Sequence, residues 1–362
     1  MSMTGAGCRQ RPWGRVDGRL ASLYTLRNRA GMHARLSDYG GTLVGLELPA
    51  AAGPPVDVVL GFDRLTGARG EAYAQEQPYL GALIGRVANR IAGAAFELEG
   101  RRVVLEPNDG PNLLHGGPQG FHTRLWAARM LDDPDAPGVA FAYRSQDGEG
   151  GFPGAVAAEA VYRLGPGPVL RLELRAVSDA VTPVSLTHHP YFNLAGHGAG
   201  DVLQHELTLF AERYTPTDAD LVPTGAVRDV AGTAFDFRVP KALGRDVTDP
   251  ALGGGYDVNF VVSGAPGTLR PAARLREPAS GRTLEIHTTQ PGLQLYTGNG
   301  LDGSLVGKGG VRYGRHAGVA LEAQALPNAV NTPRFPPVWL HPGEAYRQVV
   351  EYRFAFDADQ DA

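Results

Sequence analysis

Hydrophobic and polar residues alternate along much of this chain, and long helical stripes of apolar residues are missing. Between residues 169 and 177, leucine and alanine alternate with arginine and glutamate, and between 350 and 356 every second residue is valine, tyrosine or phenylalanine. A period of two puts one set of side chains on a buried face and the other on a wet face, which is typical of a half-buried strand. The 49 glycines and 28 prolines interrupt these runs every few residues, as turns between short strands do.

The pattern predicts many short antiparallel strands, and therefore an all-β protein with very little helix, built as a large sandwich or barrel. Residues 96–105 read as a hairpin that turns at Gly100. Further strands are expected at residues 22–26, 42–48, 56–60, 139–144, 157–164, 205–210, 283–287, 293–297 and 319–324. We expect residues 19–356 to form a single β domain, with residues 1–18 as a loose leader and residues 357–362 as a loose acidic tail.

Composition narrows the range of partners and locations. With 362 residues, 43% of them hydrophobic, the chain can bury a large core. The net charge is −4 and the basic residues are scattered, so nucleic acid is not an expected partner. The lone Cys8 excludes an internal disulfide and a cysteine-based zinc site. With no secretory leader and no apolar run near the ~20 residues of a membrane span, we expect a cytoplasmic protein without membrane contact that binds a small molecule.

Five segments rich in glycine, histidine, asparagine or acid lie at the expected strand ends, where catalytic loops usually occur. They are residues 85–91, 112–117, 187–194, 255–260 and 321–324. Phosphate-binding glycine loops and a Gly-x-Ser-x-Gly elbow are absent. These segments therefore hold the candidate chemistry.

Glu322 falls within the strand expected at residues 319–324, on the face opposite Val319 and Leu321. That face is either the floor of a cleft or a solvated surface, and the pattern alone favours the solvated surface. By the same parity Gln294 and Tyr296 share a face. Their chemistry is open at this point.

His115 and His189 are the most interesting imidazoles, because Gly116-Gly117 and Pro190 restrict the backbone beside them. They are either hydrogen-bonded loop histidines or functional groups. The adjacent His188 and His189 point opposite ways in an extended segment, and no two histidines have metal-ligand spacing on one face, so we expect no metal. Asp257, after three glycines, reads as a turn cap. Arg86 and Arg90 read as surface cations.

Taken in order, these segments resemble the aldose 1-epimerase, or galactose mutarotase, family. The resemblance rests on Gly-Arg-x-x-Asn-Arg-Ile, Asn-x-Leu-His-Gly-Gly, His-Pro-Tyr-Phe-Asn-Leu, Gly-Tyr-Asp-x-Asn-Phe, Thr-Thr-Gln-Pro-Gly-x-Gln-x-Tyr-Thr-Gly-Asn and Leu-Glu-x-Gln, and it extends over residues 24–352. It implies a β-supersandwich with an open sugar cleft. His188 is a departure, because asparagine is expected there in many members.

The resemblance also implies roles for individual residues. Glu322 is expected to be the general base, His189 the general acid, and His115 a second imidazole near the ring oxygen. The expected sugar ligands are Asn89, Arg90, Asp257 and Gln294. Arg86 is expected to be structural.

These roles fit the opening of a cyclic hemiacetal, in which the C1 hydroxyl loses a proton and the ring oxygen gains one. With ordinary pKa values of ~4.3 for glutamate and ~6.5 for histidine, both groups are in the required form just below neutrality. We therefore expect a cofactor-free, metal-free enzyme, a monomer or weak dimer, that interconverts the α and β anomers of a free aldose. The alternatives are a hexose-phosphate epimerase of related fold, a non-catalytic sugar-binding module and, more remotely, a glycosidase using Asp257 and Glu322.

Overall fold

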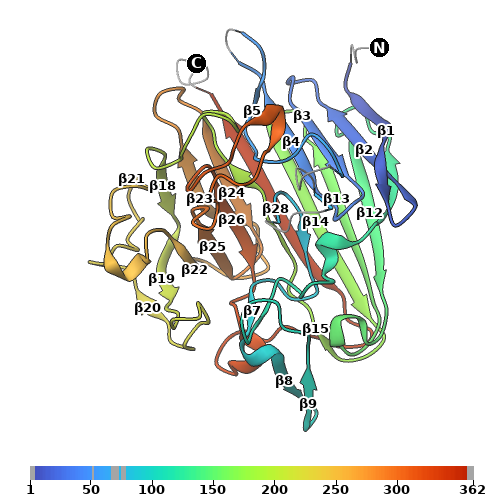
Figure 1. Ribbon diagram of the computed structural model, residues 1–362, viewed down its shortest axis with the longest axis vertical. Helices are drawn as coiled ribbons and strands as arrows, with labels where there is room; N and C mark the ends of the chain where they lie inside the picture. The colour runs from blue at the N-terminus through green and yellow to red at the C-terminus, as the bar shows by residue number, and fades with distance from the viewer. Residues whose placement is uncertain (1–4, 51–52, 67–72, 75–78, 357–362) are drawn as a thin grey trace.

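Three antiparallel sheets carry the architecture of the protein, a computed structural model that describes residues 5–50, 53–66, 73–74 and 79–356 (Figure 1). The five-stranded sheet has the order β1 (Gly7–Val16), β2 (Arg19–Arg27), β3 (His33–Ser37), β4 (Leu43–Leu48), β5 (Val56–Asp57). The nine-stranded sheet has the order β11 (Ala127–Leu131), β12 (Gly138–Ser145), β13 (Val156–Leu164), β14 (Val169–Ser178), β28 (Tyr346–Ala355), β24 (Thr283–Thr288), β23 (Arg270–Arg276), β18 (Glu206–Leu209), β21 (Lys241–Ala242). The six-stranded sheet has the order β17 (Tyr191–Phe192), β26 (Val319–Gln324), β25 (Gly292–Tyr296), β22 (Asp257–Val262), β19 (Ala211–Thr215), β20 (Arg228–Asp229).

Smaller pairs of strands and single helical turns complete the fold. The pairs are β6 (Leu83–Ile84) with β16 (Thr187–His188), β7 (Arg90–Ile91) with β10 (Leu113–Leu114), β8 (Ala95–Leu98) with β9 (Arg101–Val104), and β15 (Thr182–Pro183) with β27 (Trp339–Leu340). The 3-10 turns are η1 (Ala92–Ala94), η2 (Phe121–Thr123), η3 (Glu149–Gly151), η4 (Pro250–Leu252), η5 (Lys308–Gly310) and η6 (Ala329–Asn331). In the part of the chain that the structure describes, no helix is long and apolar enough to cross a bilayer.

The alternation read from the sequence is present in the strands. Every second residue of β13 is buried and the residues between are half-buried, and β14 repeats this pattern over most of its length. The hairpin expected at residues 96–105 is β8 and β9, in register from Ala95 opposite Val104 to Leu98 opposite Arg101. The all-β fold predicted from the period of two is confirmed.

The prediction of a loose leader over residues 1–18 is wrong for most of that segment. Gly7–Val16 forms β1, which pairs with β2 from Gly7 opposite Arg27 to Val16 opposite Arg19, with a bulge between Pro12 and Gly14. β1 is an edge strand whose residues are half-buried or exposed, so it lacks the apolar alternation that identifies the inner strands. The acidic tail expected at 357–362 lies outside the described residues.

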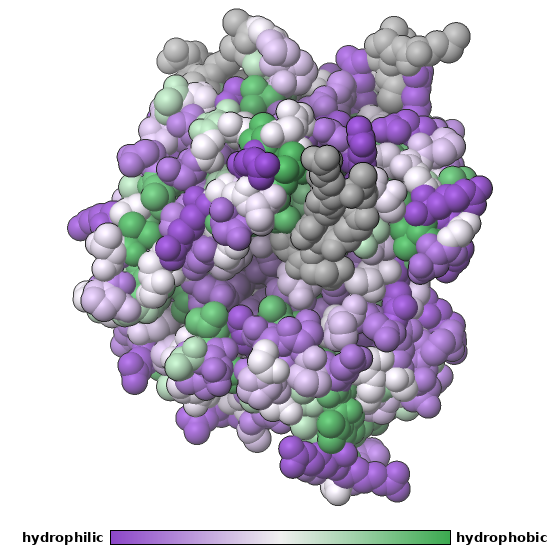
Figure 2. Space-filling view, in the orientation of Figure 1, coloured by the Kyte–Doolittle hydropathy of each residue, from purple (hydrophilic) through white to green (hydrophobic). Residues whose placement is uncertain are grey.

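The main core lies between the sheets. Tyr24 of β2 packs edge-on against Phe141 of β12, with ring centroids 5.6 Å apart, and Phe192 of β17 packs against Tyr352 of β28 at 5.5 Å. Both the five-stranded and the six-stranded sheet therefore bury one face against the nine-stranded sheet. Hydrophilic residues predominate on the face of the molecule in Figure 2, and apolar residues are scattered among them. Because strands from both halves of the chain share one core, we propose that β1 and residues 19–356 form one domain.

Candidate active site

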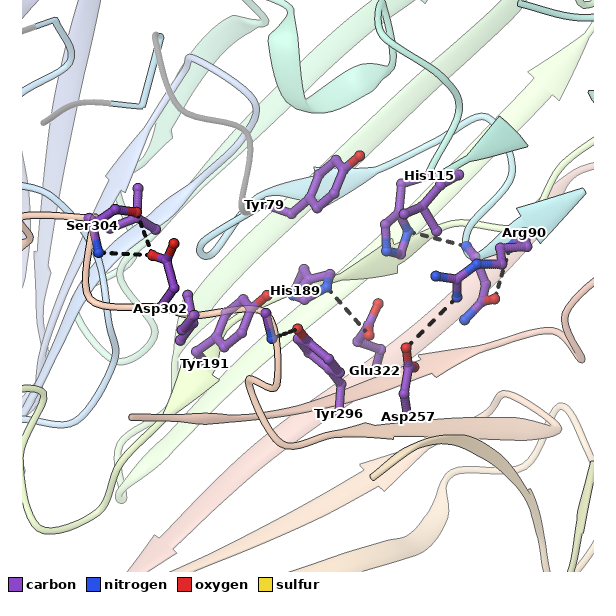
Figure 3. A pocket seen from close by; sticks show the side chains of 15 residues that line it. Tyr79, Arg90, His115, His189, Tyr191, Asp257, Tyr296, Asp302, Ser304 and Glu322 are labelled. Carbon is purple, nitrogen blue, oxygen red and sulfur yellow. Dashed lines mark hydrogen bonds and ion pairs between the residues drawn. The ribbon is translucent and has the colours of Figure 1, made fainter. Parts of the chain in front are cut away.

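A cavity of ≈ 440 Å³ lies over the face of the six-stranded sheet that is turned away from the nine-stranded sheet (Figure 3). Alternate residues of β22 and β26, such as Phe260 and Leu321, enter the main core, and Asp257 and Glu322, of opposite parity, line the cavity. The lining residues are Tyr79, Asn89, Arg90, Leu114, His115, His189, Tyr191, Asp257, Tyr296, Gly300, Leu301, Asp302, Ser304, Leu305 and Glu322.

Glu322 and His189 face each other at the centre of the cavity. Nε2 of His189 lies 3.5 Å from Oε1 of Glu322, and the two side chains are 4% and 2% exposed. Nδ1 of His189 and Oε2 of Glu322 are buried with no hydrogen-bond partner among the described residues. The solvated strand face that the pattern alone favoured for Glu322 is therefore wrong, because the loops that carry the other lining residues cover this face of β26.

A hydrogen bond fixes the proton of the His115 ring. The backbone N–H of Asn89 donates to Nδ1 of the His115 ring at 3.2 Å, and the backbone N–H of His115 donates to the backbone carbonyl of Asn89 at 3.0 Å. Because Nδ1 accepts, a neutral His115 carries its proton on Nε2 and is a hydrogen-bond donor there. Burial, with the nearby His189 and Arg90, lowers the pKa of His115 well below its ordinary value, which keeps the ring neutral.

Arg90 and Asp257 form a charged end of the cavity. Nε of Arg90 donates to Oδ2 of Asp109 at 2.7 Å, and its Nη1 lies 3.8 Å from Oδ2 of Asp257. Nε2 of Gln294 donates to Oδ1 of Asp257 at 2.6 Å. Asp257 is the half-buried first residue of β22 and does not cap a turn, and burial raises the pKa of its carboxyl against the opposing effect of Arg90. Arg90 and Arg86 are 8% and 2% exposed, so the interpretation of both arginines as surface cations is wrong.

Arg86 is tied to loops away from the cavity. Its guanidinium donates to Oγ of Ser145, to the carbonyl oxygens of Gln146 and Pro153, and to Oγ1 of Thr182. These contacts join the segment that carries Asn89 and Arg90 to the nine-stranded sheet. They support the structural role expected for Arg86.

Burial shifts the pKa values of the central pair toward their neutral forms. Desolvation, reinforced by Asp257 and opposed by Arg90, raises the pKa of Glu322 well above its ordinary value. Desolvation lowers the pKa of His189 to about 4. The expectation that the two groups keep ordinary pKa values in the cavity is therefore not met. Between these two pKa values the pair holds one proton, which resides on either the carboxylate or the imidazole.

His115, His189 and Glu322 each offer a possible metal-ligand atom, and these atoms lie within 4.8 Å of one another. Spacing in the sequence did not reveal this group, because the three residues come from separate loops and strands. A metal ligand needs a free lone pair, whereas Nε2 of His115 carries the ring proton when Nδ1 accepts from Asn89. The donor set thus fits a sugar oxygen better than a metal ion.

The structure brings six of the seven predicted site residues into one cavity: Asn89, Arg90, His115, His189, Asp257 and Glu322. Gln294 is buried next to Asp257 and is not among the lining residues. The sequence reasoning placed Tyr296 on the same face as Gln294 without giving it a role, and it missed Tyr79, Tyr191, Asp109, Asp302 and Ser304. Tyr191 and Tyr296 belong to the sequence motifs that carry the family resemblance. Tyr79, Asp302 and Ser304 lie in loops, where hydrophobic and polar residues do not alternate.

The cavity has the composition of an acid–base site for a small polyhydroxylated molecule. The profile of the aldose 1-epimerase family matches residues 22–353. The galactose mutarotase of Homo sapiens is 47% identical over 317 residues, covering 88% of this chain and 89% of that protein, and the aldose 1-epimerase of Escherichia coli K12 is 38% identical over 343 residues, covering 93% and 96%. A solved aldose epimerase homologue from C. elegans superposes with a TM-score of 0.84 at 31% identity, covering 93% and 99%. The chain belongs to the aldose 1-epimerase family, and the resemblance read from its motifs is confirmed.

Proposed function

We propose that this protein interconverts the α and β anomers of a free aldose, with Glu322 and His189 as the acid–base pair. The observation that carries the proposal is the approach of Nε2 of His189 to Oε1 of Glu322, 3.5 Å apart, at the centre of a polar cavity. Ring opening needs one proton acceptor and one proton donor in the same pocket, and this pair supplies both.

The proton balance of the reaction matches the single proton of the pair. In the reactive form Glu322 is a carboxylate and His189 an imidazolium. Glu322 takes the proton of the C1 hydroxyl, the bond from C1 to the ring oxygen breaks, and the ring oxygen takes the proton of His189. The open aldehyde then faces a neutral imidazole and a carboxylic acid, which is the form that burial favours. After rotation about the C1–C2 bond, the same steps run in reverse on the other face.

The surrounding side chains support binding of sugar hydroxyls. Nε2 of His115 donates toward the cavity, where the ring oxygen or a neighbouring hydroxyl can accept. Asp257 offers carboxylate oxygens, and Arg90 and Asn89 offer donors, on the same side of the cavity. Gln294 acts on the sugar only through Asp257, because its side-chain amide donates a hydrogen bond to the Asp257 carboxyl. We therefore propose Gln294 as a positioning residue and not as a direct ligand.

Charge favours a neutral sugar over a phosphorylated one. The Glu322–His189 pair holds one proton and is neutral overall, so the charged groups that remain among the described lining residues are the carboxyls of Asp257 and Asp302 against the single guanidinium of Arg90. That guanidinium already contacts Asp109 and Asp257. A sugar phosphate would meet net negative charge here, which disfavours the hexose-phosphate epimerase. The buried, sparsely paired Glu322 and His189 are costly groups that binding alone would not need, which disfavours the sugar-binding module.

Polarimetry on freshly dissolved α-D-glucose and α-D-galactose tests this function. Added protein should speed the approach to the equilibrium rotation, with a bell-shaped pH dependence. The acid limb should lie near the pKa of about 4 of His189, where the pair gains a second proton, and the alkaline limb at the raised pKa of Glu322, where it loses its last one. Rates equal to the buffer-catalysed reaction at every pH would refute the proposal. The cytoplasmic location and the monomer or weak dimer stay predictions.

A further inference from the structure

Two tyrosine rings enclose the imidazole of His189 (Figure 3). The ring of Tyr191 stacks on it with a centroid distance of 4.9 Å and an interplanar angle of 26°, and the ring of Tyr79 stacks with 5.9 Å and 27°. Figure 3 shows His189 between the two tyrosines, with Glu322 at its edge. The face of each phenol ring is thus turned toward the imidazole, and the edge of the imidazole toward the carboxylate.

Tyr79 belongs to a turn that is bonded to the backbone of His189. The Gly81 N–H donates to the His189 carbonyl at 2.8 Å, and the His189 N–H donates to the Ala82 carbonyl at 3.0 Å. Tyr79 itself has a φ of 58°, a left-handed conformation that bulky residues rarely adopt. A strained backbone that persists at a cavity wall suggests that the position of the ring matters.

The same ring also contacts the other imidazole of the proposed site. The centroid of Tyr79 lies 4.7 Å from that of His115, with an angle of 64° between the rings. It therefore touches both histidines while its turn fixes the main chain of one of them. The ring also lies against His122, with centroids 4.8 Å apart, so a single side chain packs on the imidazoles that surround the proposed acid.

The stacked rings act on charge as well as on position. The face of an aromatic ring is negative and attracts a cation within ≈ 6 Å of its centroid, more strongly when water is excluded. Both tyrosines satisfy this distance for His189. Burial disfavours the imidazolium that ring opening requires, and the two faces act in the opposite direction.

We propose that Tyr79 is a positioning residue, whose ring, with that of Tyr191, holds His189 against Glu322 and stabilises its imidazolium form during ring opening. The role in catalysis rests on the proposed function. Other titratable groups also lie near His189. They are Glu322 of β26, His115 in the loop after β10, His122 of η2, Tyr79, Tyr191 and the adjacent His188.

The first test removes the ring and then restores it. Tyr79→Leu keeps apolar volume but loses the aromatic face. We expect the pKa of His189, followed by NMR of its ring nitrogens, to fall by roughly one, and kcat to fall about 5- to 30-fold with KM little changed. Tyr79→Phe retains the face and should restore both. Tyr214→Leu is the matched control, because the ring of Tyr214 in β19 stacks on Phe235 with centroids 4.4 Å apart and is not part of the cavity lining, so it should leave the pKa of His189 unchanged.

A graded series keeps the shape of the side chain if Tyr79→Leu fails to fold. Phenylalanines carrying one, two or three ring fluorines at position 79 progressively weaken the negative face, and the pKa of His189 should fall with each fluorine. A flat series, or Tyr79→Phe behaving like Tyr79→Leu, would overturn the proposal. The titration needs no substrate, so a wild-type protein without mutarotation would refute the proposed function, while the titration would still decide the role of Tyr79.

Discussion

Two pairs of an acidic and a basic side chain inside this protein differ in how many of their polar atoms have hydrogen-bond partners. Nζ of Lys308 donates to Oδ2 of Asp57 at 2.7 Å and to the carbonyl oxygens of Val44 and Val59 at 3.0 and 2.7 Å. Asp57 also accepts from Arg35 at 2.7 Å and from backbone N–H groups. The side chains of Glu322 and His189 are 2% and 4% exposed, against 12% and 4% for Asp57 and Lys308. Nε2 of His189 lies 3.5 Å from Oε1 of Glu322, and each of these two residues has an unpartnered atom within the described part of the protein.

The pKa directions follow from this difference. Burial acts to raise the pKa of Asp57, but Lys308 and Arg35 outweigh it and hold the pKa below its ordinary value, so the carboxylate stays charged. Around Glu322 burial prevails, and its pKa is raised. Complete hydrogen bonding thus fixes a charge and makes a structural link, whereas incomplete bonding leaves a proton that can move. The first pair stabilises the fold, and the second is available for chemistry.

The largest expected effect on catalysis comes from removing the proposed proton acceptor of the incompletely bonded pair. Glu322→Gln keeps the shape and removes the carboxylate that is proposed to accept the C1 proton. We expect kcat in polarimetry to fall ~10²–10⁴-fold, the range for losing an acid–base group, while sugar binding by calorimetry persists through Asp257 and Arg90. Near-native turnover with a native spectrum would show that the incompletely bonded pair is not the reactive one.

Breaking the completely bonded pair should affect stability instead. Lys308→Met leaves Asp57 buried with Arg35 and backbone donors only. We expect the free energy of unfolding to fall by about 3 kcal/mol, near the lower end for losing one partner of a buried pair, in urea titrations. Arg238→Ala is the control, because Arg238 pairs with Asp236 at the surface, and its loss should change the free energy of unfolding much less than Lys308→Met does. Equal losses of stability in Lys308→Met and Arg238→Ala would show that burial does not make the Lys308–Asp57 pair more important for stability than a surface ion pair.

The sequence predicted the strands better than it predicted the loops. The period of two predicted β13, β14, β26 and β28, since alternate residues of each strand enter the main core. β1 was missed, because an edge strand with Pro12 and Gly14 buries too little to show a pattern. The parity of β26 was read correctly.

The burial of Glu322 could not be read from its own strand, because residues more than 130 positions away cover it. Tyr79 was missed for a related reason. Its role depends on a left-handed φ and on contacts with two distant histidines, neither of which leaves a local signal. The motifs located the cavity, but the distances within it required the fold.

The smallest effect is expected at the histidine beside the proposed acid. His188 was predicted to point away from His189, and Nδ1 of His188 lies 2.9 Å from the hydroxyl of Tyr352, in the core on the side of the nine-stranded sheet. His188→Asn introduces the residue expected in many family members and removes one buried hydrogen bond from Tyr352. We expect it to cost about 1–2 kcal/mol of stability, and to change kcat less than tenfold.

His189→Asn should lower kcat ~10²–10⁴-fold, because it removes the proposed acid. The two variants differ by one position along the chain, so their comparison in parallel polarimetry and urea titrations separates the acid from its neighbour. Equal losses of kcat, or a larger loss in His188→Asn, would transfer the proposed acid to His188.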